Sequence, residues 1–127
     1  CRMVCTDEAD CHLQACNAGC TMDCGGSRCE LDECGSGCSI ACHPGRTCRI
    51  GECTGPGCHI GPIDLVSGQA TLVIEDCAGG YCSLECRAGD TCTIGSCAGG
   101  DCTIACEEGA TCNCSDTGCS VEPLPPA

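Results

Sequence analysis

Cysteine recurs at nearly fixed intervals along this chain of 127 residues, and this spacing restricts the fold more than any other feature. From Cys38 the next four cysteines follow after 4, 6, 5 and 5 residues, and the same four steps recur from Cys82. Each unit spans about 18–20 residues and has four cysteine positions, here named first to fourth. A repeat of this length is typical of a solenoid. The units begin at Cys1, Cys20, Cys38, Cys58, Cys82 and Cys102, and a seventh begins at Cys119.

The composition indicates that disulfides hold the chain together. It has 23 Cys and 19 Gly but one Tyr and no Phe or Trp, which excludes a core built on aromatic side chains. Cysteine at this density is typical of a disulfide scaffold, and disulfides persist in oxidising compartments. We therefore expect an extracellular or cell-surface protein. No apolar run is long enough for a transmembrane helix.

Aliphatic residues alternate with the cysteines in a pattern that predicts strands. One lies midway between the first and second cysteines, as Ile40 does, and another lies two residues after the third, as Ile50 does. Because side chains alternate between the two faces of a strand, these residues share a face with the cysteines. Glycine-rich corners separate the strands. The sequence thus predicts an all-β fold: a flattened, disulfide-laddered β-solenoid of about six coils over residues 1–121, followed by a Pro-rich tail at 122–127.

The fourth unit indicates how the inner cysteines pair. It has Pro62 and Leu72 where the second and third cysteines belong, so both cysteines are lost together. We therefore expect the second cysteine of each coil to bond to the third across the core. The expected pairs are Cys5–Cys11, Cys24–Cys29, Cys42–Cys48, Cys86–Cys92 and Cys106–Cys112.

The first and fourth cysteines form the outer edge, and the sequence leaves their pairing open. The fourth cysteine bonds either to the first of its own coil or to the first of the next, since disulfide geometry allows both. Because 23 is odd, one cysteine is left over: Cys119 in the first arrangement and Cys1 in the second. A spare Cys1 is compatible with a lipid anchor, and a spare thiol at either end with an intermolecular bridge. The outer cysteines are Cys16, Cys20, Cys34, Cys38, Cys53, Cys58, Cys77, Cys82, Cys97, Cys102 and Cys114.

One stretch departs from the repeat. Residues 62–76, PIDLVSGQATLVIED, carry two alternating apolar segments around Ser-Gly-Gln, which predicts a hairpin-like insertion. We expect Leu72 and Ile74 to refill the core where two cysteines are missing. An apolar projection from a polar rod is a candidate docking surface. Its residues are Ile63, Leu65 and Val66.

Charge and motifs argue against several functions. The net charge of −13 argues against nucleic acids and anionic membranes as partners, since both require cationic patches. His12, His43 and His59 occupy three different places in the unit, which argues against a metal triad or a catalytic base. Cys-x-x-Cys, typical of thiolate metal sites, is absent from the sequence, as are catalytic motifs. We expect a non-enzymatic protein without catalytic residues, metal ligands or a cofactor.

Runs such as CAGGDCTIACEEGATC at 97–112 resemble exported bacterial cysteine-rich repeat proteins of uncharacterised function. The resemblance covers the chain apart from 63–70 and the tail, and it implies an exported or surface location without a known activity. The chain is less similar to disulfide-stapled β-solenoids such as insect antifreeze proteins, because its coils differ in length and charges interrupt its outward Thr and Ser face.

The repeat shows no polar cap at either end, and uncapped solenoid strands expose edges that can pair with another chain. We therefore predict a structural protein, a disulfide-stapled rod that self-associates end to end into a surface fibre or filament. The alternative is a monomeric secreted binding module that binds ice, glycan or calcium on one solenoid face.

Overall fold

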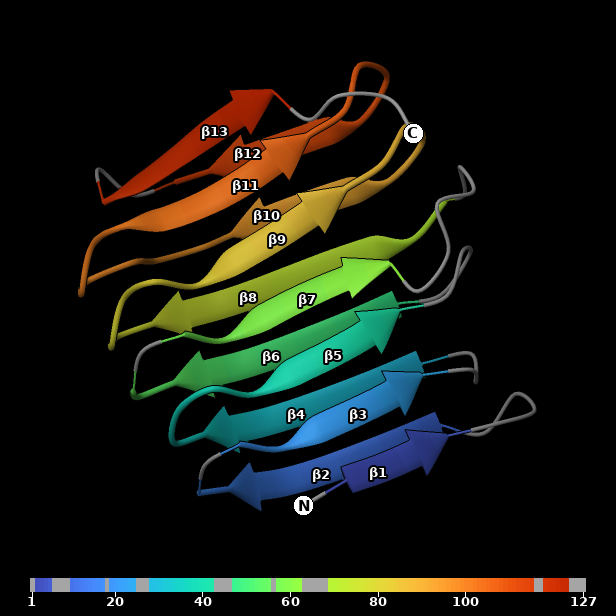
Figure 1. Cartoon of the computed structure of the whole chain (residues 1–127), viewed down its shortest axis with the longest axis vertical. Helices are drawn as coiled ribbons and strands as arrows, with labels where there is room; N and C mark the ends of the chain where they lie inside the picture. Colours follow the sequence, from blue (N-terminus) through green and yellow to red (C-terminus); the bar gives the residue numbers. More distant parts are fainter. Residues whose placement is uncertain are drawn as a thin grey trace.

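The computed structural model describes residues 2–5, 10–17, 19–24, 28–42, 47–55, 57–62, 69–115 and 118–123, and within them every regular element is a β-strand. The strands stack along one axis with the first coils at one end and the last at the other (Figure 1). Their bounds are β1 (Arg2–Cys5), β2 (Asp10–Cys16), β3 (Thr21–Cys24), β4 (Arg28–Cys34), β5 (Ser39–Cys42), β6 (Thr47–Cys53), β7 (His59–Pro62), β8 (Thr71–Cys77), β9 (Ser83–Cys86), β10 (Thr91–Ile94), β11 (Cys102–Cys106), β12 (Thr111–Cys114) and β13 (Cys119–Pro123).

The strands form two parallel sheets. Odd-numbered strands make the odd sheet, in the order β1-β3-β5-β7-β9-β11-β13, and even-numbered strands make the even sheet, in the order β2-β4-β6-β8-β10-β12. Because the chain alternates between the sheets, each coil adds one strand to each, and the sheets form two layers (Figure 1). The predicted flattened, disulfide-rich β-solenoid is confirmed.

Equivalent residues of successive coils align in columns along the axis. Ile40 is in register with Ile60 in the odd sheet, and Ile50 with Ile74 in the even sheet. Burying one such side chain contributes about 1.5–3 kcal/mol, so aliphatic stacking supplements the disulfides. The column residues at most 1% exposed are Met22, Ile40, Ile60, Leu84 and Ile104 in the odd sheet and Leu31, Ile50, Ile74 and Ile94 in the even sheet.

The fourth coil fits these columns without its two inner cysteines. Leu72 lies between Cys48 and Cys92 in the even sheet, and Pro62 is in register with Cys42 in the odd sheet. Leu72 is 1% exposed and therefore refills the core, as the sequence predicts. The chain closes this coil with a buried aliphatic side chain where its neighbours use a disulfide.

Residues 71–77 at the end of the predicted hairpin-like insertion form β8, and Leu72 and Ile74 on this strand are buried, as the sequence predicts. β8 runs parallel to β6 and β10 on either side, so it is a regular coil strand. Ala70 also belongs to the coil: it is 3% exposed, and its N–H donates to the Asp90 carboxylate. The first arm lies outside the described residues, together with the candidate docking surface, Ile63, Leu65 and Val66.

Glycine-rich corners carry the chain from the even sheet to the odd sheet after each fourth cysteine. The backbones of successive corners lie almost in contact here. A Cβ atom on Gly55 would lie 2.0 Å from the carbonyl oxygen of Gly35, and one on Gly79 would lie 2.1 Å from the carbonyl carbon of Gly55. Glycine is therefore required at these positions for the coils to stack at the spacing of a β-sheet.

Candidate functional site: disulfide ladder, polar faces and a hollow

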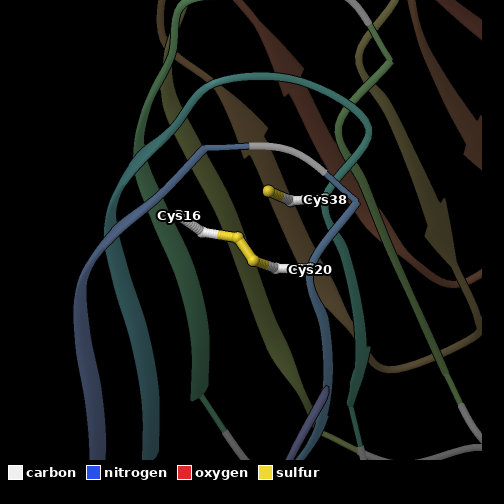
Figure 2. Close-up of side chains that lie close together, drawn as sticks. All are labelled: Cys16, Cys20 and Cys38. Atoms are coloured by element: carbon white, nitrogen blue, oxygen red, sulfur yellow. A yellow bond between two sulfur atoms is a disulfide. The ribbon is translucent and has the colours of Figure 1, made fainter. Parts of the chain in front are cut away.

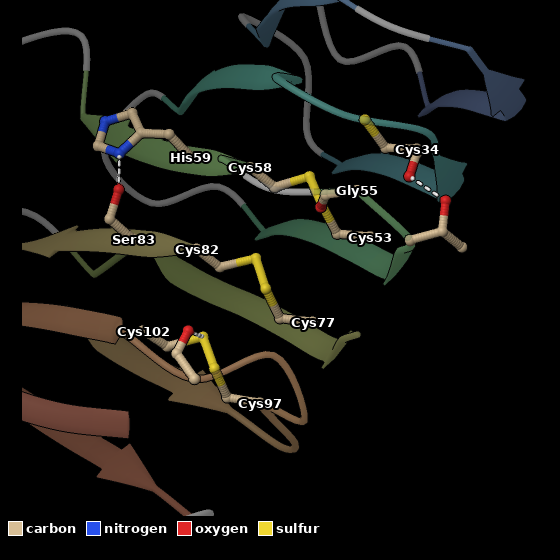
Figure 3. The surroundings of a disulfide bond; sticks show 12 residues. Cys34, Cys53, Gly55, Cys58, His59, Cys77, Cys82, Ser83, Cys97 and Cys102 are labelled. Atoms are coloured by element: carbon tan, nitrogen blue, oxygen red, sulfur yellow. Dashed lines mark hydrogen bonds between the residues drawn. A yellow bond between two sulfur atoms is a disulfide. The ribbon is translucent and has the colours of Figure 1, made fainter. Parts of the chain in front are cut away.

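The corner cysteines resolve the pairing that the sequence leaves open. In six corners the fourth cysteine of one coil bonds to the first cysteine of the next, with Cα–Cα distances of 5.8–6.4 Å. Each bond bridges the corner at which the chain passes from the even sheet to the odd sheet, and Figure 3 shows three of them one above another. The bonds are Cys16–Cys20, Cys34–Cys38, Cys53–Cys58, Cys77–Cys82, Cys97–Cys102 and Cys114–Cys119.

A second set of disulfides closes the opposite edge. The bonded pairs there have Cα–Cα distances of 6.2–6.4 Å and are pairs that the sequence predicts: Cys42–Cys48, Cys86–Cys92 and Cys106–Cys112. Cys11 and Cys29 are disulfide-bonded as well. The side chains of Cys5 and Cys24 lie outside the described part, so the pairs Cys5–Cys11 and Cys24–Cys29 stay predictions.

The last described corner corrects two interpretations. Cys119 is bonded to Cys114, so the interpretation of Cys119 as the left-over cysteine is wrong; pairing across the corner uses it. Cys1 lies outside the described residues. Cys114 does not continue the column of fourth cysteines either. It is in register with Ile94 in the aliphatic column, because it follows its third cysteine by two residues instead of five.

The corner disulfides stack closely. The sulfur atoms of Cys16, Cys20 and Cys38 lie within 4.8 Å of one another, and Figure 2 shows the Cys38 sulfur beside the Cys16–Cys20 bond. Free thiolates at this spacing could hold a metal ion. A sulfur atom in a disulfide is not a thiolate and does not serve as such a ligand. Similar groups of three cysteine sulfurs recur at the following corners, and in the described part each of these sulfurs belongs to a disulfide. While oxidised, the stack is therefore a structural ladder in which each bridge packs against the next.

Charged groups are buried at the inner corner between β9 and β10. The Asp90 carboxylate, 3% exposed, accepts the N–H of Ala70 at 3.1 Å and that of Arg87 at 3.0 Å. Burial raises the pKa of the Asp90 carboxyl above its usual value, although these two bonds oppose the shift. The Arg87 guanidinium, itself buried, donates to Glu85 at 2.9 Å and to Glu107 at 3.2 Å. The group thus links the fourth, fifth and sixth coils.

The outward face of the odd sheet carries a column of small polar residues. His59 Nδ1 and Ser83 Oγ, neighbours in this column, lie 2.7 Å apart (Figure 3). The sequence places His59 and Ser83 in one outward column, but the contact itself was not predicted, because the spacing of the repeat does not fix the orientation of the imidazole. The adjacent column carries Asp23, Glu85 and Glu122, so charges interrupt this face. The small polar column is Thr21, Ser39, His59, Ser83, Thr103 and Ser120.

The even sheet presents charged side chains on its first coils. His12 Nε2 lies 2.7 Å from Asp32 Oδ2, and an Arg28 nitrogen lies 2.6 Å from Glu30 Oε1. His12, Glu30 and Asp32 place three ligand atoms within 4.8 Å of one another. They are exposed or half-buried and already engaged in these polar contacts, so we assign them no metal. His43 lies outside the described residues.

An open hollow of about 640 Å³ lies beside the last corners, over β11 and β13. Tyr81 and Asp101 reach it from successive corners, and Glu122 lies on β13. Sequence reasoning missed this site. A signal was present: the corners CAGGYC and CAGGDC end in Tyr or Asp, where CNAGC, CGSGC and CTGPGC end in Gly.

Comparisons with known proteins do not indicate a function for this chain. The chain matched no family model, no curated protein and no solved structure. Within the described residues there is no helix with the length and apolar character needed to cross a membrane.

Proposed function

We propose that this chain is a non-enzymatic extracellular structural protein, a rigid rod whose copies associate end to end into a fibre. The observation that carries the proposal is the disulfide ladder on both edges of the coils. Closing a loop of five or six residues contributes about 2 kcal/mol by restricting the unfolded chain. The proposed extracellular location follows from the oxidising conditions that these bonds require, and the resemblance to exported bacterial repeat proteins supports it.

The edge of the odd sheet at β13 supports end-to-end association. Val121 continues the buried column of Leu84 and Ile104, yet it is 48% exposed. β13 pairs with β11, and no strand in the described part pairs with its other edge. An unpaired edge above an open apolar column is suited to strand addition from a second copy.

Sedimentation velocity and negative-stain electron microscopy of the oxidised chain test the proposal. Linear particles should lengthen as protein concentration rises. Val121→Lys should shift the population to single rods, because it places a charge at the top of the apolar column. The matched control is Val73→Lys, on the outer face of the even sheet, which should assemble normally. Single rods at all concentrations, or equal effects of the two variants, would contradict the proposal.

The second candidate is a monomeric secreted binding module. The hollow at Tyr81 and Asp101 favours it, because a structural rod has no need of a concave polar site. A rod that stays monomeric but binds a ligand in this hollow would support this candidate over the first.

A further inference from the structure

We propose that the hollow over β11 and β13 is a binding site for an organic cation, a guanidinium or primary ammonium group. Its volume of about 640 Å³ lies in the range of small-molecule sites. The inference does not depend on whether the rod forms fibres. The side chains that carry it are Tyr81, Asp101, Thr103, Ser120 and Glu122.

Neighbouring coils bring Tyr81 and Asp101 to the same corner. Each residue directly precedes the first cysteine of its coil, and the N–H of Tyr81 donates to the carbonyl oxygen of Gly100 at 3.0 Å. Tyr81 is 61% exposed, and Asp101 is exposed as well. A ligand in the hollow would therefore meet an aromatic ring and a carboxylate that project from adjacent corners.

Folding alone would favour glycine at these two positions. Tyr81 and Asp101 have φ of 58° and 59°, a left-handed backbone that is unfavourable for residues with a side chain. A Cβ atom at the equivalent Gly19 would meet nothing within 4 Å, so the corner has room for a side chain. The chain carries side chains here in spite of the backbone conformation, as is common at binding sites. Earlier coils have glycine with positive φ at this position: Gly19, Gly37 and Gly57.

The strands complete the site with oxygen atoms. Thr103 on β11 is in register with Ser120 on β13, and Glu122 follows Ser120 on the same outward face. Together with Tyr81 and Asp101, these residues supply two carboxylates and three hydroxyl groups. Among the described residues, no Arg, Lys or His lines the hollow.

This lining selects for a cation that donates hydrogen bonds. Carboxylates bind N–H donors of charged groups strongly, and the face of a tyrosine ring attracts a cation. An anion would find no positive charge in the hollow. Calcium is coordinated by oxygen atoms alone, whereas the ring of Tyr81 adds attraction for an organic cation, so an organic cation fits this lining better than a metal ion.

Tyr81 makes the proposal directly measurable, because it is the only Tyr, Phe or Trp residue in the chain. The oxidised protein would be titrated with N-ethylguanidinium chloride at constant ionic strength while the ring signals of Tyr81 are followed by NMR. We expect a saturable shift. Asp101→Asn tolerates the left-handed backbone but lacks the charge, and it should weaken affinity about 3–10-fold.

Two further variants separate binding from folding. Tyr81→Gly restores the residue of the earlier coils and should fold; backbone amide signals of Thr103 and Ser120 should then report affinity reduced about threefold by loss of the ring. Glu108→Gln removes one exposed charge at the opposite edge and should bind like the unmodified chain. Equal affinities of Asp101→Asn and the unmodified chain would overturn the proposal. A shift of equal size with the neutral methyl glucoside would overturn it too.

A dilution series without added ligand identifies the source of the cation. The chain has five Arg, so a second copy could supply a guanidinium group. In that case the Tyr81 ring signals change with protein concentration, and ethylguanidinium reverses the change. Signals that do not depend on concentration, with saturable ethylguanidinium binding, assign the site to a free small cation.

Discussion

The fourth and fifth coils occupy equivalent places in one solenoid but close their inner edges differently. In the fifth coil, β9 and β10 are joined by Cys86–Cys92. In the fourth, β7 and β8 have Pro62 and Leu72 at those positions, and Leu72 is as buried as the cysteines above and below it. A buried leucine therefore replaces a disulfide in one coil whose neighbours on both sides are crosslinked.

The fourth coil also depends on its neighbours for polar support. The N–H of Ala70 has the carboxylate of Asp90, from the fifth coil, as its acceptor. Its corner disulfides are retained: Cys53–Cys58 joins it to the third coil and Cys77–Cys82 to the fifth. The comparison indicates that the inner bridge is replaceable locally, while the continuous outer ladder holds the stack together. Four predictions test that difference, beginning with the greatest loss of stability.

Removing the inner bridge of the fifth coil should have the largest effect. Cys86→Ala combined with Cys92→Ala leaves two adjacent coils without an inner crosslink. We expect the free energy of unfolding to fall by about 3–4 kcal/mol, from lost loop restriction and two small cavities. Guanidinium denaturation without reductant measures it. Cys106→Ala with Cys112→Ala, in the less buried sixth coil, is the matched control and should cost less; an equal or larger cost there would contradict the comparison.

Truncating Leu72, the side chain that replaces the inner disulfide, should have the second largest effect on the free energy of unfolding. Leu72→Ala should lower the free energy of unfolding by about 3 kcal/mol, because the fourth coil has no inner disulfide to limit collapse of the cavity. Val73→Ala, one residue away on the outward face, should cost less than about 1 kcal/mol. The same denaturation experiment compares them. Similar losses of unfolding free energy in both variants would mean that Leu72 does not take the place of the inner disulfide in this coil.

Asp90→Asn should have a smaller effect, and one that depends on pH. An amide has one acceptor oxygen where the carboxylate offers two, so one of the N–H groups of Ala70 and Arg87 loses its partner, at a cost of about 1–2 kcal/mol at pH 7. The pKa of Asp90 is raised in the folded chain. Its titration therefore contributes stability that is present below the unfolded pKa and lost as pH rises through the folded pKa.

The stability difference between the unmodified chain and Asp90→Asn should consequently grow as pH falls from 7 toward 4. Denaturation curves at several pH values measure it, and Glu108→Gln, an exposed acid in the next coil, is a control without this trend. A difference that shrinks in acid would show that Asp90 is not held as a buried, desolvated carboxyl.

The ion pair between Arg49 and Glu75 should have the smallest effect. It links the third and fourth coils at 2.5 Å, and the guanidinium lowers the pKa of Glu75. Both groups are substantially exposed, so Arg49→Gln should cost less than about 1 kcal/mol, and less still in 1 M salt. Because the pKa is lowered, the contribution is lost as pH falls through it. A cost above 2 kcal/mol, independent of salt, would contradict this assignment.

The spacing of the cysteines was enough to predict the coil, because every strand repeats the same alternation of buried and exposed positions. Leu72 and Ile74 could be assigned to the core from their place in that pattern alone. The inner pairs could be predicted because the fourth unit lacks both of its middle cysteines together, and the structure contains the predicted Cys42–Cys48 bond. The outer pairs could not be chosen, because both arrangements satisfy the same distance limits and only the path of the corner decides between them.

The sequence did not reveal features that depend on contacts between coils. Arg87 and Asp90 look like ordinary polar turn residues in RAGDT, and their burial depends on coils four and six. Tyr81 and Asp101 replace a corner glycine in single coils, and only stacking brings them to one hollow. The residue types at these positions do not indicate such contacts, because the contacts form only when the coils stack.

Complete reduction tests most directly the claim that disulfides hold the solenoid together. The chain would be treated with a phosphine reductant at pH 7 without denaturant, its thiols blocked, and its amide hydrogen exchange compared with that of the oxidised form. We predict that protection in the strands is lost throughout, including in the fourth coil with Leu72. Strands that remain protected in the fully reduced chain would contradict the account.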